Sequence, residues 1–293
     1  GRLNLQSLLQ ESGRGSAGGR GTALRSSLGV VQTGLAVVLL IATGLFVRSF
    51  WNATQVDPGF DAHKLHTFRV PLPETRFPDS GARIAMVRRI LDELSGLPGV
   101  ESVTGTSAVP VITGMGYLTF TEFGDDPMDQ GEQKAADNFF ITEDFFRTMG
   151  IPILNGRGIE LQDQEDAPVV YVADATMEQR FLGAEPIGAR MTFGSVPDEG
   201  EPWPTVIGTV PRIIHRDLTD LNQAPLVYRS FYQNPRGSIS FLLRSDRDHE
   251  TLLSDIRTVT GRLDSNLPIY RTGRLDELIE NSLQERKAVM GLT

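Results

Sequence analysis

The sequence predicts an α+β protein in which one transmembrane helix precedes a two-lobed outer domain. Three observations lead to this prediction. A run of twenty residues without charge lies near the start of the chain. Two similar strand–helix–strand patterns follow, one soon after that run and one near the other end. A stretch rich in Gly and Pro separates them. The two patterns predict a ferredoxin-like split βαβ lobe, and the stretch between them predicts an inserted α+β lobe.

The predicted transmembrane helix covers residues 28–50. Its uncharged portion, 28–47, rises about 1.5 Å per residue and so spans roughly 30 Å, the thickness of the hydrocarbon core of a bilayer. Arg25 and Arg48 flank this run, and Trp51 lies where interfacial aromatic residues occur. A retained helix is favoured over a cleaved signal peptide, because a long polar segment precedes the run and no small-residue cleavage pattern follows it.

The distribution of charge predicts the orientation. Residues 1–50 carry five Arg and one acid, a net charge of +4, whereas residues 51–293 carry 23 basic and 36 acidic residues, a net charge of −13. Basic residues before a membrane helix favour the cytoplasm, so residues 1–27 are predicted as a cytoplasmic linker and the acidic domain as extracytoplasmic. The acidity argues against nucleic acid as a partner. The chain has no Cys, which excludes disulfides and thiolate chemistry.

The first strand–helix–strand unit follows a turn at 56–61, where Asp-Pro-Gly favours a bend. A strand is predicted over Leu65–Val70. Apolar residues spaced three and four apart predict a helix over 79–95, whose apolar face consists of Ile84, Val87, Leu91 and Leu94. Gly96 and the Leu-Pro-Gly after it end this helix. The returning strand is predicted over Val100–Thr104.

The second unit repeats the pattern near the C-terminus. A strand is predicted over Ile239–Arg244, and Asp248 can cap a helix with the apolar face Leu252, Ile256, Val259 and Leu263. The returning strand is predicted over Leu267–Arg271. Because a helix crosses over the sheet between the two strands of each unit, those two strands should run parallel.

Residues 105–235, between the two units, have frequent Gly and Pro between short apolar runs. They predict the following elements: strands at 169–172, 204–210 and 225–229, and short helices at 142–149 and 174–182 that stop at Gly150 and Gly183. The complete outer domain is predicted over 51–274. The last segment, 275–293, is predicted as a helix that leads to a further membrane span.

Two groups of residues are candidates for metal or acid–base chemistry. His63 and His66 stand three apart without a third ligand, so a solvated turn is favoured over a metal site. The tripeptide His215-Arg216-Asp217 is interpreted as the charged loop after the strand at 204–210 rather than as part of a catalytic triad.

The remaining candidate motifs also favour structural interpretations. Two acidic groups lack the spacing of a calcium loop and are interpreted as surface loops: Asp125, Asp126 and Asp129, and Asp163, Glu165 and Asp166. The segment GRGSAG at 13–18 matches a phosphate-binding pattern but lacks the strand and helix that this pattern requires, so it is interpreted as linker. No P-loop and no G-x-S-x-G motif occurs. We therefore expect no catalytic, cofactor or metal site and no enzymatic activity.

Within the predicted membrane helix, small and polar residues suggest contact with other helices. Gly34 and Gly44 would allow close packing, and Gln32 would gain a hydrogen-bonding partner there. Other membrane helices, of the same protein or of a second copy, are therefore expected partners.

Several motifs then occur in a specific order. They are Q-x-x-L-A-x-x-L-L ending in Arg-Ser (32–49), VDPGF (56–60), F-F-x-x-M-G-I-P-x-L-x-G-R (145–157) and P-I-G (186–188). In this order they resemble the MacB/FtsX-type ABC transporter permeases over essentially the whole chain. Pro211 departs from the Gly-Asp or Gly-Asn that often follows the preceding strand. The linker LLQESGRGS also resembles the junction inside duplicated permeases of the Acidobacteria type.

This resemblance implies a MacB-like periplasmic core domain held in the bacterial inner membrane. It implies that a separate ATPase subunit binds ATP in the cytoplasm, that hydrolysis moves the membrane helices, and that the periplasmic lobes move with them. A periplasmic partner protein and a role in efflux are compatible with it. The working parts would be the membrane helix, the turn at 56–60 and the βαβ lobe.

Two other functions remain open at this point. A single-pass sensor or scaffold would use the outer domain to bind a ligand or protein, and a membrane-anchored enzyme would need a pocket with converging titratable groups. The chain starts with Gly and ends at Met-Gly-Leu-Thr, so we expect it to be a segment of a longer permease.

Overall fold

The computed structural model describes residues 29, 31–46, 57–113, 117–125, 134–216 and 222–290. The chain forms two compact units, residues 1–56 and 57–293, and each is described by itself. The predicted linker at 1–27 and the end of the predicted membrane helix at 47–50 lie outside the described residues.

In the first unit, residues 31–46 are helical. Large apolar side chains along this helix are exposed, including Leu40 (72%) and Phe46 (74%). The hydroxyl groups of Thr33 and Thr43 donate hydrogen bonds to carbonyl oxygens one turn earlier, at 2.8 and 2.7 Å, so neither hydroxyl needs a partner outside the helix. Among the helices within the described ranges, none has both the length and the apolar character needed to cross a bilayer.

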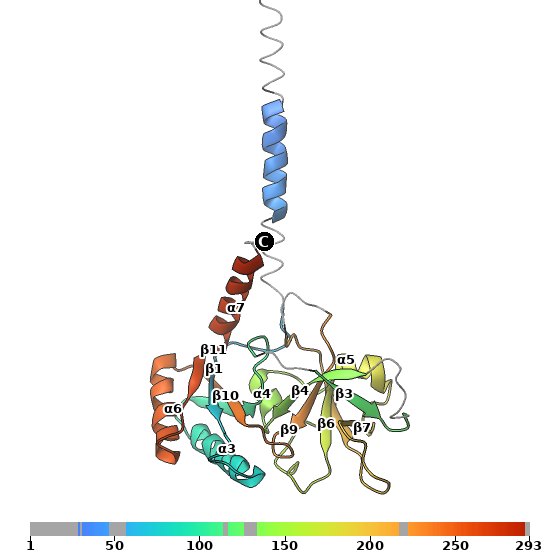
Figure 1. Ribbon diagram of the computed structural model, residues 1–293. Coiled ribbons are helices and arrows are strands. Elements are labelled where there is room, and N and C mark those ends of the chain that lie inside the picture. The colour runs from blue at the N-terminus through green and yellow to red at the C-terminus, as the bar shows by residue number, and fades with distance from the viewer. Residues whose placement is uncertain are drawn as a thin grey trace, which may run out of the picture. The chain divides into compact units, whose positions relative to one another are not determined.

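The second compact unit contains both predicted strand–helix–strand motifs. Strand β1 (Leu65–Pro71), helix α3 (Ser80–Ser95) and strand β2 (Val100–Thr106) form the first motif. Strand β10 (Ser238–Ser245), helix α6 (His249–Leu263) and strand β11 (Tyr270–Arg274) form the second. Figure 1 shows α3 and α6 beside one another on this part of the sheet.

The four strands of the two motifs lie in the order β11-β1-β10-β2. Strand β10 pairs antiparallel with both β1 and β2, and β11 pairs antiparallel with β1. The strands joined by each helix are therefore parallel to one another, which confirms the prediction. The final strand begins at Tyr270 rather than at Leu267, because Leu267 is buried against the core and its N–H closes a turn on Asp264.

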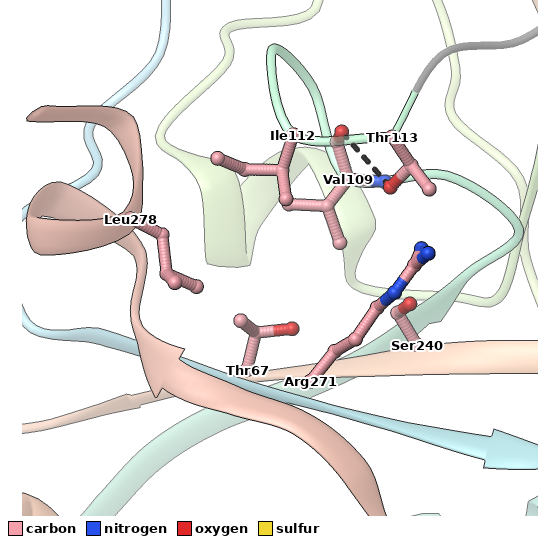
Figure 2. Close-up of a pocket in the computed structure, with 7 residues that line it drawn as sticks. All are labelled: Thr67, Val109, Ile112, Thr113, Ser240, Arg271 and Leu278. Carbon is pink, nitrogen blue, oxygen red and sulfur yellow. Dashed lines mark hydrogen bonds between the residues drawn. The ribbon is translucent and has the colours of Figure 1, made fainter. Parts of the chain in front are cut away.

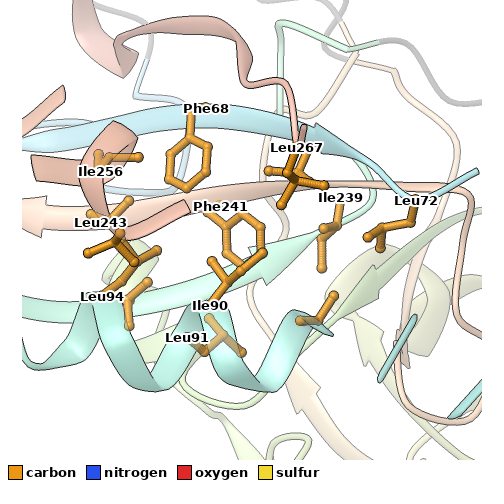
Figure 3. Packing of buried hydrophobic residues seen from close by; sticks show 14 of the residues in the cluster. Phe68, Leu72, Ile90, Leu91, Leu94, Ile239, Phe241, Leu243, Ile256 and Leu267 are labelled. Atoms are coloured by element: carbon orange, nitrogen blue, oxygen red, sulfur yellow. The ribbon is translucent and has the colours of Figure 1, made fainter. Parts of the chain in front are cut away.

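Both helices start at a capping carboxylate. Asp79 accepts a hydrogen bond from the N–H of Ala82 at 2.7 Å, and Asp248 accepts one from Thr251 at 3.1 Å, which satisfies backbone donors that a helix leaves free at its start. The apolar faces pack on the sheet, where Phe68 of β1 and Phe241 of β10 stack with ring centroids 5.1 Å apart. Figure 3 shows the leucine and isoleucine side chains that fill the space around these rings.

We call residues 57–104 and 236–290 the βαβ part and residues 105–235 the inserted part. The inserted part contains the following elements: β3 (Tyr117–Glu122), β4 (Ala135–Ile141), α4 (Phe145–Met149), β5 (Asn155–Gly156), β6 (Val170–Asp174), α5 (Ala175–Met177), a π-helical turn (Glu178–Leu182), β7 (Met191–Phe193), β8 (Thr205–Val210) and β9 (Leu226–Ser230). The strands continue the sheet in the order β2-β4-β9-β6-β8-β5, and β3 joins β4 to β7. The last described helix, α7 (Leu275–Met290), begins at Leu275, as predicted.

The inserted part differs from its predicted elements in its strands and in its helices. Strands β3, β4, β5 and β7 were not predicted. The helix predicted from residue 142 starts only at Phe145, although it stops as predicted at Gly150, whose φ is +70°. The helix predicted over 174–182 is one short α-helical turn that widens into the π-helical turn before Gly183. A separate apolar cluster, which includes Phe120, Tyr171, Met191 and Val206, fills this part.

A narrow join connects the two parts of the sheet. Strands β2 and β4 share only the pair Thr106 and Ile141. Two hydroxyl groups extend this join, since the N–H of Gly105 donates to Thr142 Oγ1 at 2.8 Å and the N–H of Phe140 donates to Ser107 Oγ at 3.0 Å.

Candidate functional site

The incoming segment of the second unit, residues 57–61, is a tight turn. Gly59 has a φ of +78°, and its N–H donates to Asp57 Oδ1 at 2.8 Å. A Cβ at this position would lie 2.7 Å from the carbonyl oxygen of Arg212, so only Gly fits here. The N–H of Ile214 donates to the carbonyl oxygen of Pro58 at 2.8 Å. The predicted turn is therefore present, and it packs directly against the inserted part.

One arginine holds this turn to two other elements. Arg244, at the end of β10, donates to Asp61 Oδ2 and to the carbonyl oxygen of His63, each at 2.8 Å. The same guanidinium donates to the carbonyl oxygen of Thr148, at the end of α4, at 2.8 Å. The N–H of Asp61 in turn donates to the carbonyl oxygen of Met149 at 2.9 Å. Arg244 thus connects the incoming segment, β10 and α4, and we call these contacts the Arg244 clamp.

The outgoing segment lies next to the incoming one. Strand β11 pairs with β1, His66 lying opposite Arg274, and α7 starts directly after it. Leu275 is fully buried at the start of α7. Asp276 accepts a hydrogen bond from Arg274 at 2.7 Å, which lowers the pKa of Asp276, and it lies 3.5 Å from His63 Nδ1. The segments by which the chain enters and leaves this unit therefore join neighbouring strands.

A cavity of about 340 Å³ lies between these strands, the loop after β2 and the outgoing helix. Figure 2 shows Leu278 of α7 and Ile112 of the loop on one side and the guanidinium of Arg271 on the other. Arg271 and Val111 have φ values of +51° and +67°, a conformation that side-chain-bearing residues rarely adopt. The lining contains hydroxyl groups and one guanidinium but no carboxylate or imidazole, so it lacks an acid–base pair.

A buried cluster of charged groups lies inside the inserted part. Asp137 of β4 is fully buried, and its Oδ2 lies 2.6 Å from His215 Nε2. Arg216 donates two hydrogen bonds of 2.6 Å to the same carboxylate. Burial favours the neutral form of Asp137, but the hydrogen bonds from His215 and Arg216 outweigh it and lower the pKa of the carboxyl group.

His215 and Arg216 lie in the loop after β8, as predicted, but His215 is buried in that loop. Its other ring nitrogen, Nδ1, lies 3.4 Å from the carbonyl oxygen of Ile213. Both ring nitrogens thus face groups that hold the side chain in place, and neither is aligned on a nucleophilic hydroxyl. Asp217 lies outside the described residues. The adjacent His215 and Arg216 were visible in the sequence, but nothing in the sequence indicated that both would bind Asp137.

The other sequence candidates also separate in space. His63 is exposed, whereas His66 is buried on β1 with its Nδ1 3.0 Å from His249 Nδ1, so the interpretation of both as a solvated turn is wrong for His66. The interpretation of Asp163 as part of a surface loop is also wrong, since Asp163 is buried and Arg157 compensates its charge with two hydrogen bonds at 2.7 and 2.8 Å. Glu165 and the residue after it are exposed, as predicted.

Of the remaining acidic and glycine-rich candidates, only Asp125 lies among the described residues. Asp125 Oδ2 accepts a hydrogen bond from Lys134 Nζ at 2.8 Å. Asp126, Asp129 and the segment 13–18 lie outside the described residues. In the part of the chain that the structure covers, no group of three His, Cys, Asp or Glu residues could hold a metal ion.

Comparison with known proteins gives one family and several similar folds. The model of a family described as MacB-like periplasmic core domain matches residues 28–259. The periplasmic region of MacB from Actinobacillus actinomycetemcomitans is 16% identical, with a TM-score of 0.49, and the match covers 80% of this chain and 98% of that one. The extracellular domain of the noncanonic ABC-type transporter YknZ from Gram-positive bacteria is 12% identical, with a TM-score of 0.42, and the match covers 68% and 95%. No curated protein matches the chain.

Proposed function

We propose, from the premise that this chain belongs to the family of MacB-like periplasmic core domains, that it forms part of the permease of an ABC-type export or mechanotransmission system. In this proposal a separate ATPase subunit hydrolyses ATP in the cytoplasm. The chain itself carries no catalytic site, and it passes the resulting movement to its outer domain. Further membrane helices, of the same permease or of a second copy, complete the assembly, and a periplasmic protein is a further partner.

The observation that carries this proposal is the arrangement of the incoming and outgoing segments. A displacement of a membrane segment reaches the outer domain only if the connection is stiff. Strands β1 and β11 pair with one another, and the Arg244 clamp ties the incoming turn to β10 and to α4. Hydrogen bonds to a charged group contribute about 1.5–3 kcal/mol each, so a set of them on one guanidinium resists separation of these elements. A pull on the chain at either end would therefore be passed to the sheet.

The helix in the first unit supports membrane anchoring over 28–50. Its described residues expose a continuous series of large apolar side chains, which in water is unfavourable and in lipid is not. Its two threonine hydroxyls are satisfied within the helix, as backbone-bonded polar groups in lipid should be. We propose that residues 1–27 lie in the cytoplasm and the acidic unit in the periplasm, because the basic residues precede the helix.

The orientation can be tested with single cysteines, because the chain has none of its own. Ser16→Cys lies in the predicted linker at 1–27, and Glu199→Cys lies at an exposed position of the second unit. A membrane-impermeant maleimide should label Glu199→Cys in cells with a permeabilised outer membrane. It should label Ser16→Cys only after the inner membrane is broken. The opposite pattern would overturn the orientation.

The coupling can be tested on the complete permease purified with its ATPase. A spin label at Glu199→Cys reports the distance between the outer domains of two copies, and we expect that distance to change when ATP is added. Arg244→Gln should leave ATP hydrolysis intact and abolish most of the change. Arg262→Gln, which removes an exposed arginine paired with Glu93 at 3.4 Å on the helix surfaces, should change neither quantity. A full distance change in Arg244→Gln would contradict the proposal, and failure of any ATPase to co-purify would favour a single-pass sensor.

A further inference from the structure

Two arginines, one on the last strand of the inserted part and one where the βαβ part resumes, border a second pocket. Arg229 of β9 and Arg236 of the loop after it line a pocket of about 260 Å³ together with Leu118, Thr119, Phe140, Phe193, Gly194 and Asn234. Both guanidinium groups lie over the ring of Phe140, at 4.9 and 4.1 Å from its centroid. Arg229 also lies 5.2 and 5.3 Å from the ring centroids of Tyr171 and Phe193.

Neither guanidinium has a carboxylate partner among the described residues. Arg236 reaches only the side-chain oxygen of Asn234, at a long 3.4 Å, and Arg229 contacts aromatic rings alone. This is unusual in a chain with a net charge of −9, in which many other arginines are paired with acids. Arg229 is half-buried and Arg236 is exposed at the mouth of the pocket. A cation partly removed from water without an anion, as Arg229 is, is costly, and aromatic faces offset only part of that cost.

The electrostatics of the two groups agree with this picture. Burial lowers the pKa of Arg229, and the nearby charge of Arg236 lowers it further. Burial also lowers the pKa of Arg236. Both guanidinium groups remain positively charged, because arginine is not deprotonated in proteins at neutral pH. An anion in the pocket would relieve the repulsion between the two guanidinium groups and replace the hydration that Arg229 loses by burial.

The geometry of this pocket points to a binding site for a phosphate monoester that carries an apolar substituent, and we propose this as a second role for the inserted part. Two planar guanidinium groups supply two positive charges and the forked donors that match phosphate oxygens. Leu118, Phe140 and Phe193 provide an apolar wall beside them. The volume lies below the range of about 300–1,000 Å³ typical of complete drug-sized ligands, so the site would take the charged end of a molecule and the first part of its apolar group. This inference is independent of the proposed transport function.

The test measures binding by calorimetry on the full chain in an uncharged detergent, with phenyl phosphate, inorganic phosphate and benzoate as probes. We expect phenyl phosphate to bind about tenfold more tightly than inorganic phosphate, because its ring is buried on the apolar wall. We expect it to bind more tightly than benzoate as well, because two guanidinium groups match a dianion better than a monoanion.

Variants then locate the site. Arg236→Gln, at an exposed position that should not disturb folding, is expected to weaken phenyl phosphate binding about tenfold or more. Arg229→Lys keeps the charge but loses the fork, and it should weaken binding less than Arg236→Gln. Arg262→Gln removes one positive charge on α6 and should leave the affinity within about twofold. Circular dichroism confirms that each variant is folded.

Three results on binding strength would overturn the inference, and so would a fourth, on selectivity. The three are undiminished binding by Arg236→Gln, an equal loss in Arg262→Gln, and equal affinity for phenyl phosphate and inorganic phosphate. The first two would show that the arginine pair is not the site. The third would show that the apolar wall contributes nothing. Tighter binding of benzoate than of phenyl phosphate would also contradict the proposed chemical class.

Discussion

The βαβ part and the inserted part belong to the same sheet but have different interiors. Beneath α3 and α6 the core consists almost entirely of apolar side chains, such as Leu94 and Phe241. The inserted part buries Asp137 with His215, and it buries Asp174 of β6 completely. An apolar core tolerates exchange among side chains of similar size, whereas a buried charge needs its own partners. The comparison shows that two neighbouring regions of one sheet can be stabilised by different kinds of interaction.

The largest effect should come from breaking the charged cluster. Asp137→Ala leaves His215 and Arg216 without their shared carboxylate, and removal of one partner from a buried pair costs about 3–5 kcal/mol. Urea denaturation of the full chain measures this loss. Leu94→Ala is the matched change in the apolar core, with an expected loss of about 2–5 kcal/mol from the cavity it creates. If Asp137→Ala were the milder of the two and below about 1 kcal/mol, the inserted part would not depend on its charges.

A smaller effect should come from the close approach of two backbones at the far edge of the sheet. A Cβ at Gly208 of β8 would lie 2.0 Å from the carbonyl oxygen of Arg157. Gly208→Ala should therefore disrupt the pairing of β5 with β8 and destabilise the protein by about 1–3 kcal/mol, as overpacking does. Gly261→Ala in α6 has no atom within 4 Å of the new Cβ, and it should stabilise the protein by about 0.5–1 kcal/mol. If Gly208→Ala and Gly261→Ala changed the free energy of unfolding in the same direction, the two glycines would not differ as we expect.

The smallest effect should be a difference in pH dependence. Burial lowers the pKa of His66, and the charges of His249 and Arg274 lower it further. The unfolded chain therefore binds a proton more readily than the folded chain, so the stability that neutral His66 provides is present above about pH 6.5 and is lost as the pH falls below it. Asp137 has a lowered pKa, so its contribution is present above the ordinary carboxyl pKa, about 3.9, and is lost only at lower pH.

Urea denaturation at pH 7 and pH 5.5 tests this difference. The unfolding free energy of the wild type should fall between these values, and the fall should be smaller in His66→Gln. The loss caused by Asp137→Ala should be nearly the same at both pH values. An equal fall in the wild type and His66→Gln would show that another group controls stability in this range.

The sequence predicts the βαβ part well because its signals are local. Apolar spacing locates α3 and α6, and Asp248 marks where α6 begins. The capping carboxylate and the apolar faces act within a few turns of one helix, so they can be read without knowledge of the rest of the chain. The parallel arrangement of the joined strands then follows from the crossover helices.

The inserted part is harder to predict because its signals are distant in sequence. Strand β4 contains Asp137 and Asn138, which oppose a prediction of a buried strand until the partner His215 is known. The Arg244 clamp was missed for the same reason, since an arginine at the end of an apolar strand gives no sign that it will bind Asp61 and Thr148. Only a three-dimensional arrangement brings these groups together.

The narrow join between β2 and β4 has a consequence for how such proteins can diverge. Where backbone groups alone connect two strands, substitution cannot remove the connection. Here the side-chain oxygens of Ser107 and Thr142 accept hydrogen bonds across the join in addition to the backbone bonds, so Ser107→Ala or Thr142→Val would weaken the join without altering either half. The stiffness of the sheet across this join can therefore change during evolution through single substitutions.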